Sequence, residues 1–311
     1  MNETKILSDR FTDLDNFIQG EKSNYSKASP YPHIVIKDFF DEKFLDEILD
    51  AFPDLSKVQS SEEWKNKNEV KFGNNNYSSF PDLSKINSSE KWKNKNEVKF
   101  GNNNYSNFPD NIKLFFDFLN SNNFLQFLQG ITSIKEKLVN DPELNGGGLH
   151  EIKRGGVLKV HTDFNRHPNL SLDRRINVLI YLNKNWKEEY GGYLELWDKD
   201  MTKCIKKIAP TFNTMVIFST TDFSNHGHPD PLNCPIERSR KSIALYYFSS
   251  GRPEHEIINK HKKNRTYFKN REGIKNDVYE KKENFKDFLR SFKFYKYMKN
   301  FEKKYLRKKK E

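Results

Sequence analysis

Glycines divide the second half of the chain into short segments, and this pattern limits the fold more than any other feature of the sequence. They occur in groups at residues 146–148, 155–156 and 191–192. The segments beside them are short and apolar: RINVLIYLN, YLELWD, TMVIFST and SIALYYFS. Short runs rich in β-branched and aromatic residues, bounded by turn residues, are typical of strands joined by tight turns. We therefore predict a β sandwich or barrel over residues 146–253.

The residues upstream of this region predict helices and one strand. The sequence YPHIVIKDFF at residues 31–40 alternates apolar and polar side chains, as a half-buried strand does. Asp41 can cap a following helix, whose apolar residues continue at helical spacing as far as Phe52. A second apolar set at residues 112–128 predicts one or two helices, interrupted near residues 121–123. Helices therefore come first, and the β region follows.

These patterns divide the chain of 311 residues into four parts. One substantial core is expected at this length, because a second full domain would leave both halves small. The four parts are a polar lead-in at 1–30, a strand and helical region at 31–145, the β core at 146–253 and a tail at 254–311.

The tail carries the positive charge of the chain. Residues 255–311 contain 20 Lys and Arg against 8 Asp and Glu, and the whole chain has a net charge of +11. From residue 281 onward apolar residues recur at helical spacing among the lysines, which favours a helix packed on the core with a solvated basic face. Docking to an acidic partner, or to anionic lipid or nucleic acid, remains open. No base-reading motif is present, so no specific nucleic-acid binding is expected.

A tandem duplication interrupts the helical region. Residues 52–79 are repeated as residues 80–107, and 24 of the 28 positions are identical. Stacked repeat folds need about three or more units to bury a continuous core. Our hypothesis is that one copy suffices for the fold and that the other loops out into solvent.

Two cysteines, Cys204 and Cys234, occur in the whole sequence. They are too few for a disulfide framework and lack the C-x-x-C spacing of a zinc site, which indicates a reducing compartment. No stretch approaches the roughly 18 apolar residues that a membrane span needs, and the first residues lack the apolar segment of a signal peptide. We expect a soluble, cytoplasmic protein.

His161 and Asp163 are the first candidate site residues. They follow the apolar alternation of residues 157–160, and residues two apart on a strand point to the same face. A third ligand can come from the sequence Asn-His-Gly-His at residues 225–228, after the strand TMVIFST. Two histidines and one carboxylate form the facial triad that binds iron(II) in non-haem oxygenases. An H-x-D triplet by itself is weak support for such a site.

Four histidines compete for places near this site. His226 is favoured over His228 as the third ligand, because His228 precedes a proline and is expected on a loop. His167 is expected on a loop or on the substrate side. His150 follows the first glycine group and is more often a buried, hydrogen-bonded histidine than a pocket residue.

Arg240 and Ser242 strengthen the argument for a site. They share one face of the predicted strand that continues as IALYYFS, and Lys241 points to the other face. A planar guanidinium pairs with a carboxylate through two hydrogen bonds, and a neighbouring hydroxyl adds another donor. This arrangement suits the distal carboxylate of 2-oxoglutarate. Arg238 and Lys241 remain alternatives as the anchor, because the segment between His226 and Arg240 is long.

Taken in order, these motifs resemble the prolyl-4-hydroxylase-like branch of the 2-oxoglutarate/iron(II)-dependent dioxygenases. The resemblance extends over residues 146–253, and its segments are GGGLHEIKRGGVLKVHTDF, RRINVLIYLNKNW, EEYGGYLELWD, SNHGHPDPLNCP and SRKSIALYYFSSGRP. It implies a double-stranded β-helix, the jelly-roll fold shared with cupins. It also implies that Fe(2+), 2-oxoglutarate and O2 are used, with ascorbate as an expected reductant.

The resemblance assigns roles to individual residues. His161, Asp163 and His226 would bind the iron, and Arg240 with Ser242 would hold the 2-oxoglutarate carboxylate. Tyr181, in the YLN motif, would bond to the same carboxylate.

The implied reaction is hydroxylation of a C–H bond with release of succinate and CO2. A prolyl residue of a protein or peptide is the first expectation for the substrate. A free amino acid, a sugar or another small metabolite stays open, because fold and cofactor do not fix the substrate. A jelly roll that binds a ligand without catalysis is the alternative from a different class.

Overall fold

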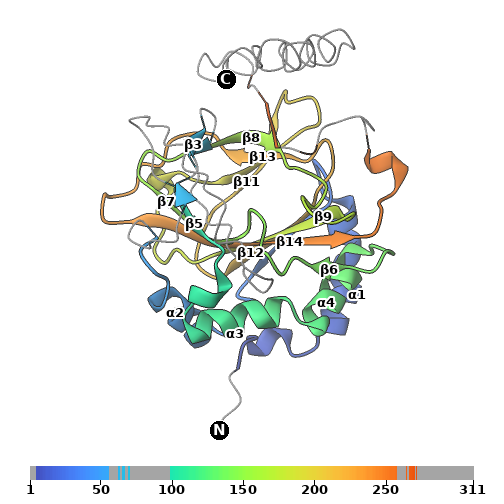
Figure 1. Ribbon diagram of the computed structural model, residues 1–311, viewed down its shortest axis with the longest axis horizontal. Coiled ribbons are helices and arrows are strands. Elements are labelled where there is room, and N and C mark those ends of the chain that lie inside the picture. Colours follow the sequence, from blue (N-terminus) through green and yellow to red (C-terminus); the bar gives the residue numbers. More distant parts are fainter. Residues whose placement is uncertain are drawn as a thin grey trace, which may run out of the picture.

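Two antiparallel sheets face each other and form the body of the protein (Figure 1). The larger sheet has the strand order β1-β12-β9-β14-β7-β5-β2, and β6 pairs with β14. The smaller sheet has the order β11-β10-β13-β8-β4-β3, and β15 pairs with β8. This arrangement is the predicted jelly-roll core. The computed structural model describes residues 5–55, 62–63, 65–66, 69–70, 99–257, 264, 266–269 and 271.

The strands are short and far apart in the sequence. Those of the larger sheet are β1 (His33–Lys37), β2 (Glu62–Glu63), β5 (Lys99–Asn102), β6 (Val139–Asn140), β7 (Gly148–Lys153), β9 (Asp173–Tyr181), β12 (Thr214–Ser219) and β14 (Ser239–Ser249). Those of the smaller sheet are β3 (Lys65–Asn66), β4 (Glu69–Val70), β8 (Leu158–Thr162), β10 (Leu194–Trp197), β11 (Cys204–Ile208), β13 (Asn225–His228) and β15 (Tyr267–Phe268). The larger sheet thus takes strands from both sides of residue 146.

Helices cover the outer face of the larger sheet, on the side away from the smaller one (Figure 1). They are α1 (Leu14–Lys27), α2 (Glu42–Asp50), α3 (Asp110–Leu119) and α4 (Asn122–Thr132), with 3-10 turns η1 (Asp9–Phe11), η2 (Tyr105–Asn107), η3 (Glu188–Tyr190) and η4 (Glu254–Glu256). Asp41 caps α2 by accepting a hydrogen bond from the backbone N–H of Phe44, as the sequence predicted. Ser121 separates α3 from α4 and caps α4 in the same way.

Strand β9 shows how one sequence serves both faces of the larger sheet. Ile176, Val178 and Ile180 are fully buried in the core that the sheet shares with the helices. Burial of each such side chain stabilises the fold by roughly 1.5–3 kcal/mol. Asn177 and Tyr181 lie on alternate positions and face the smaller sheet instead. The space between the sheets is therefore where polar side chains from this strand can meet.

The duplication contributes to the fold from its two outer ends. Phe52 and Leu55, at the start of the first copy, are buried in the main core. Asn102 and Asn103, near the end of the second copy, are also buried. Strand β2 of the first copy pairs with β5 of the second. The described contacts therefore join the beginning of one copy to the end of the other.

Part of the basic tail lies outside the described residues. This includes the helix predicted from residue 281 onward, whose packing and acidic partner stay predictions. Within the part of the chain that the structure describes, no helix combines the length and the apolar character that crossing a bilayer requires. Both cysteines are free.

Candidate active site

Two paired strands of the smaller sheet bring His161, Asp163 and His226 together. His161 on β8 lies opposite His226 on β13, and their ring centroids are 4.5 Å apart. Asp163 follows β8 directly and lies between them: its Oδ1 is 3.5 Å from Nε2 of His161, and its Oδ2 is 3.5 Å from Nε2 of His226. All three side chains are buried. One ligand atom from each lies within 4.8 Å of the others, which is close enough to share a metal ion.

The hydrogen bonds of the two imidazoles fit a metal site. Nδ1 of His161 lies 2.8 Å from the carbonyl oxygen of Lys159, and Nδ1 of His226 lies 2.9 Å from that of Ser224. A carbonyl oxygen only accepts, so each Nδ1 carries the proton and each Nε2 keeps a lone pair. Fixing the tautomer through the distal nitrogen is how metal-binding histidines are usually oriented.

The charge states of the three residues suit a cation as well. Burial lowers the pKa of His226 to about 4, although Asp163 opposes the shift, so this imidazole is neutral near pH 7. Burial acts to raise the pKa of Asp163, but the neighbouring charge of Arg174 opposes it most strongly, and the pKa of this carboxylate lies well below its usual range. The neutral imidazole of His226, Nε2 of His161 and the carboxylate of Asp163 are thus presented together, a donor set that suits iron(II).

A buried arginine shares the cavity with these three residues. Arg240 on β14 is 4 % exposed; its Nε donates to the carbonyl oxygen of Gly192 at 2.8 Å, and an Nη donates to the hydroxyl of Tyr181 at 3.2 Å. Ser242 lines the cavity two residues further along the strand. Among the described residues Arg240 has no carboxylate partner. Because a buried charge is costly unless it is paired, this guanidinium is suited to receive an anion.

The alternative anchors lie elsewhere. Arg238 donates to the carbonyl oxygens of Lys184 and Asn185, outside the cavity. Lys241 points to the opposite face of β14, where its ammonium lies 5.7 Å from the ring centroid of Phe52. The two-residue period of the strand separates Arg240 from Lys241, whereas Arg238 precedes the strand, which begins at Ser239.

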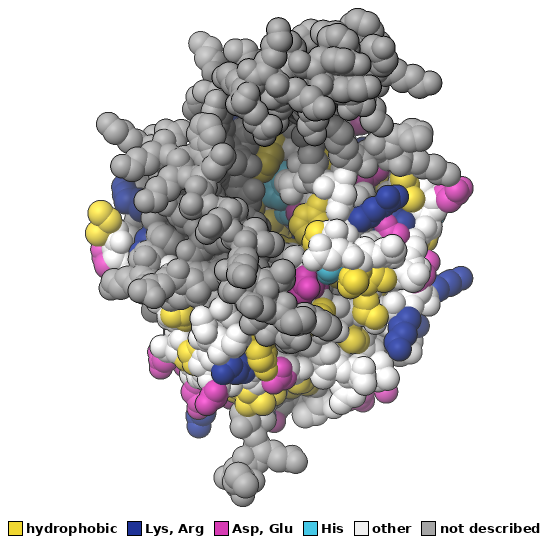
Figure 2. All heavy atoms as spheres, in the orientation of Figure 1, with side chains coloured by type: hydrophobic (Ala, Val, Ile, Leu, Met, Phe, Trp, Pro, Cys, Tyr) yellow, Lys and Arg dark blue, Asp and Glu magenta, His cyan; other side chains and the backbone are white. Residues whose placement is uncertain are grey.

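The structure adds cavity residues that the sequence argument did not select. His228 is the last residue of β13 and does not lie on the loop predicted for it; it lines the cavity but is not part of the three-residue cluster. His150 lies opposite Ser242 in the pairing of β7 with β14 and lines the cavity, contrary to the expectation that it is a core histidine. Figure 2 shows histidine and hydrophobic side chains in a hollow on the face that it presents. The remaining lining residues are Leu158, Asn177, Leu179, Leu194, Gly227 and Tyr246.

A period-two reading of the strands could have found several of these residues. Asn177 and Leu179 precede Tyr181 at two-residue steps, and Tyr246 follows Ser242 at a four-residue step. Residues that share a strand face with a chosen site residue are candidates for the same cavity. His150 has no such signal, because its position depends on the pairing of two strands distant in the sequence.

The tail also reaches the site. Strand β15 pairs with the C-terminal end of β8, at His161 and Thr162. The backbone N–H of Lys269 also donates to the carbonyl oxygen of Val160 at 2.7 Å. The ring of Phe268 lies against that of His161, with 5.4 Å between centroids. The sequence argument treated the tail as separate from the site, because nothing local indicates which strand β15 joins.

His167 belongs to a second cluster, with Asp141 and Glu143. Its Nδ1 accepts from the backbone N–H groups of Asn169 and Leu170, so its Nε2 carries the proton and lies 3.2 Å from Oδ1 of Asp141. A metal at Nε2 would displace that proton and leave an imidazolate. The cluster is therefore explained as a hydrogen-bonded joint between two loops.

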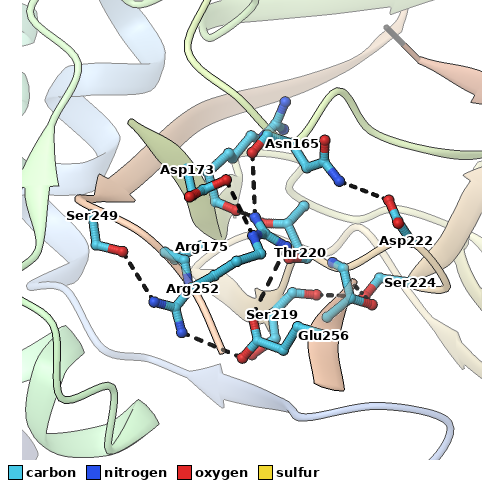
Figure 3. Close-up of polar contacts among 12 residues, drawn as sticks. Asn165, Asp173, Arg175, Ser219, Thr220, Asp222, Ser224, Ser249, Arg252 and Glu256 are labelled. Carbon is cyan, nitrogen blue, oxygen red and sulfur yellow. Dashed lines mark hydrogen bonds and ion pairs between the residues drawn. The ribbon is translucent and has the colours of Figure 1, made fainter. Parts of the chain in front are cut away.

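Arg252 braces the loops behind the candidate ligands (Figure 3). Its side chain is 1 % exposed, and its guanidinium donates to the carbonyl oxygens of Thr220 at 2.9 Å and Asn165 at 3.3 Å. It also forms ion pairs with Asp173 at 3.5 Å and Glu256 at 3.9 Å. One side chain thus ties the loop after Asp163 to the turn that leads to β13.

The turn itself is held by short-range hydrogen bonds (Figure 3). The hydroxyl of Ser224 donates to the carbonyl oxygen of Ser219 at 2.7 Å, while the carbonyl oxygen of Ser224 fixes His226. The side-chain amide of Asn165 donates to Asp222 at 2.7 Å and links this turn to the loop after Asp163. The relative placement of Asp163 and His226 therefore depends on a continuous polar network.

Two histidines and a carboxylate on a jelly roll, beside a buried arginine without a carboxylate partner among the described residues, are the set that the sequence predicted for a 2-oxoglutarate/iron(II) oxygenase. The sequence comparison agrees, because residues 147–248 match the model of the 2OG-Fe(II) oxygenase superfamily. This part of the chain is similar to that class of dioxygenases, and the predicted resemblance to its prolyl-4-hydroxylase-like members is confirmed.

Individual relatives are similar over limited regions. Prolyl 3-hydroxylase OGFOD1 of Mus musculus is 32 % identical over 79 residues, which are 24 % of this chain and 14 % of that protein. The chain thus matches about one seventh of the length of this relative. A prolyl hydroxylase from Trichoplax adhaerens, solved with a peptide fragment of hypoxia inducible factor, has a TM-score of 0.51 and 16 % identity over 77 % of this chain and 92 % of that one. A Phytophthora capsici prolyl 4-hydroxylase has a TM-score of 0.48 and 18 % identity, over 79 % of this chain and 66 % of that one.

Proposed function

We propose that this protein hydroxylates a C–H bond with iron(II), 2-oxoglutarate and O2, and releases succinate and CO2. The observation that carries the proposal is the single cavity that contains both the cluster of His161, Asp163 and His226 and the unpaired guanidinium of Arg240. The cluster suits the metal, and the guanidinium suits the distal carboxylate of the co-substrate.

Each residue has a defined task in this proposal. His161, Asp163 and His226 hold the iron, which when bound supplies the activation of oxygen for C–H oxidation. Arg240 receives the distal carboxylate, and Tyr181 and Ser242 add hydroxyl donors beside it. Gly192 accepts from Arg240 and keeps the guanidinium turned toward the cavity. The buried setting excludes water and strengthens these charge interactions.

For the substrate we propose a prolyl residue of a protein or peptide. The mouse relative that matches part of this chain is named a prolyl 3-hydroxylase, which supports this choice over a free amino acid, a sugar or another small metabolite. Ascorbate is proposed as the reductant that keeps the iron in its iron(II) state. The two free thiols, Cys204 and Cys234, suit a reducing compartment such as the cytoplasm.

The test is succinate formation from 2-oxoglutarate with iron(II) and ascorbate, with and without a pool of proline-containing peptides. The matched control is Asp163→Ala, which removes one proposed ligand. Succinate that depends on Asp163 and rises with the peptides supports both the reaction and the substrate class. If succinate forms but does not rise with the peptides, a small metabolite becomes the favoured substrate class. If no succinate forms although iron is bound, the chain is a binding module and the proposal is wrong.

A further inference from the structure

Asp163 is held by two neighbours that the proposed reaction does not yet use. Arg174, at 1 % exposure, donates from Nη2 to Oδ2 of Asp163 at 2.9 Å. The side-chain amide of Asn177, at 2 % exposure, donates to the same oxygen at 2.7 Å. Oδ2 therefore accepts hydrogen bonds from two buried donors.

The two donors are themselves locked together. Oδ1 of Asn177 accepts from Nε of Arg174 at 2.9 Å and from its Nη2 at 2.7 Å, which fixes the orientation of the amide. The guanidinium carbon of Arg174 lies 3.4 Å from the ring centroid of Tyr246 and 4.5 Å from that of Phe164. Stacking on aromatic rings is available to a planar guanidinium and not to an ammonium. The carboxylate therefore meets a rigid, pre-formed receptor for one of its oxygens.

The two oxygens of Asp163 differ in these hydrogen bonds. Oδ1 lies 3.5 Å from Nε2 of His161, and Oδ2 lies at the same distance from Nε2 of His226, so both oxygens face the histidine nitrogens of the cluster. Among the described residues, Arg174 and Asn177 both donate to Oδ2 and not to Oδ1. These two donors therefore fix how the carboxylate is turned toward the cluster.

We propose that Arg174 and Asn177, with Tyr246 stacked on the guanidinium, are positioning residues that fix the orientation in which Asp163 would hold the metal. This inference rests on the proposed function, because it assumes a metal between His161, Asp163 and His226. Arg174 and Asn177 act through Asp163 and need not contact the metal.

The chain contains a matched control for a buried arginine. Arg175 is the next residue on β9, is 3 % exposed, and pairs with Glu136 at 2.9 Å and Glu256 at 3.3 Å. Figure 3 shows its contact with Glu256. Replacing either arginine by lysine keeps the charge and removes the planar fork. A general loss of stability affects both variants, whereas a specific effect on Asp163 appears with Arg174→Lys only.

The experiment titrates Co(II) into the metal-free full-length protein, with circular dichroism to confirm the fold. Arg174→Lys and Asn177→Ala are each expected to weaken Co(II) binding by about 10- to 100-fold, the usual effect of removing a partner of a metal ligand. They should also change the visible absorption of bound Co(II) and weaken 2-oxoglutarate binding to the Co(II)-loaded protein. Arg175→Lys should match the wild type in all three measurements.

The outcomes separate this inference from the proposed function. If the folded Asn177→Ala and Arg174→Lys variants bind Co(II) with wild-type affinity and absorption, the inference is overturned, while wild-type succinate formation keeps the function. An equal loss in Arg175→Lys also overturns it, because the effect is then general. If Arg174→Lys does not fold, Asn177→Ala decides. If the wild type binds no Co(II) and forms no succinate, both proposals fail.

Discussion

At the scale of single residues, Arg240 has an unusual position. It is buried with two neutral hydrogen-bond acceptors and without a carboxylate partner among the described residues. Burial acts to lower its pKa, yet the guanidinium keeps its proton because the ordinary pKa of arginine is far above neutrality. A permanent charge in such a place needs a ligand of opposite charge, and this requirement leads to the first prediction.

Arg240→Ala is expected to raise the 2-oxoglutarate concentration required for half-maximal succinate formation by about 10- to 100-fold. The reason is the loss of charge-assisted hydrogen bonds worth roughly 1.5–3 kcal/mol. The maximal rate should fall much less, since the metal ligands stay in place. The matched control is Arg238→Ala, which removes an arginine outside the cavity and should leave the 2-oxoglutarate requirement unchanged. A raised 2-oxoglutarate requirement in Arg238→Ala, with none in Arg240→Ala, would show that Arg238 holds the carboxylate.

The choice between two histidines is also a residue-scale question. Nε2 of His226 lies 3.5 Å from Asp163, whereas His228 lines the cavity outside the cluster. We expect His226→Ala to abolish measurable Co(II) binding and His228→Ala to change the Co(II) affinity by a few-fold at most. Calorimetric titration measures both. Retained binding in His226→Ala together with loss in His228→Ala would show that the third ligand is wrong.

At the scale of elements, the site depends on loops that are tied together behind it. Arg252 contacts the loop after β8, the start of β9 and the turn between β12 and β13. Strands β8 and β13, which lead to the candidate ligands, are short, and the contacts of Arg252 fix the relative position of their ends. Stability and metal binding should therefore change together when the brace is removed.

Arg252→Met is expected to lower the free energy of unfolding by about 3 kcal/mol, because it leaves Asp173 without its buried cation and removes the donor to the carbonyl oxygens of Thr220 and Asn165. Denaturant unfolding followed by circular dichroism measures the change. The control is Arg10→Ala, which removes an ion pair between exposed side chains and should leave the unfolding midpoint almost unchanged. Equal effects in the two variants would contradict the role of Arg252 as a brace.

At the scale of the whole molecule, the duplication tests how much of the chain the fold needs. The described contacts use Phe52 and Leu55 from the first copy and Asn102 and Asn103 from the second. Deleting residues 71–98 removes 28 residues and keeps all four. Deleting residues 80–107 gives almost the same sequence, with Ser79 in place of Asn107.

We expect the protein without residues 71–98 to fold and to keep its metal affinity, with a free energy of unfolding within about 1 kcal/mol of the full chain. The reason is that the entropy of closing a loop depends only weakly on its length. Failure to recover soluble, folded protein would contradict the hypothesis that one copy suffices.

A pair of point variants tests the same hypothesis in the full chain. Leu55 is fully buried, and Leu83 is its counterpart in the second copy. Leu55→Ala should lower the free energy of unfolding by about 3 kcal/mol, as is usual for a core leucine. Leu83→Ala should have little effect. Similar losses in both variants would mean that both copies contribute to the core.

The sequence by itself determined the features that depend on local periodicity. Alternation with a period of two placed His161 with Asp163, and Arg240 with Ser242, on common strand faces, and the glycine-bounded apolar runs predicted the β core. Helical spacing, the cap at Asp41 and the interruption near residues 121–123 predicted the helices. These features are local because φ and ψ preferences and side-chain direction repeat over a few residues.

Only the tertiary structure decided which distant residues meet. The pairing of β13 with β8 brought His226 and not His228 into the cluster, and the pairing of β7 with β14 turned His150 into a cavity residue. No pattern in the sequence predicted that Arg174 contacts Asp163 or that β15 pairs with β8. Such contacts depend on strand register and loop closure between residues far apart in the chain, and no short window of sequence contains both partners.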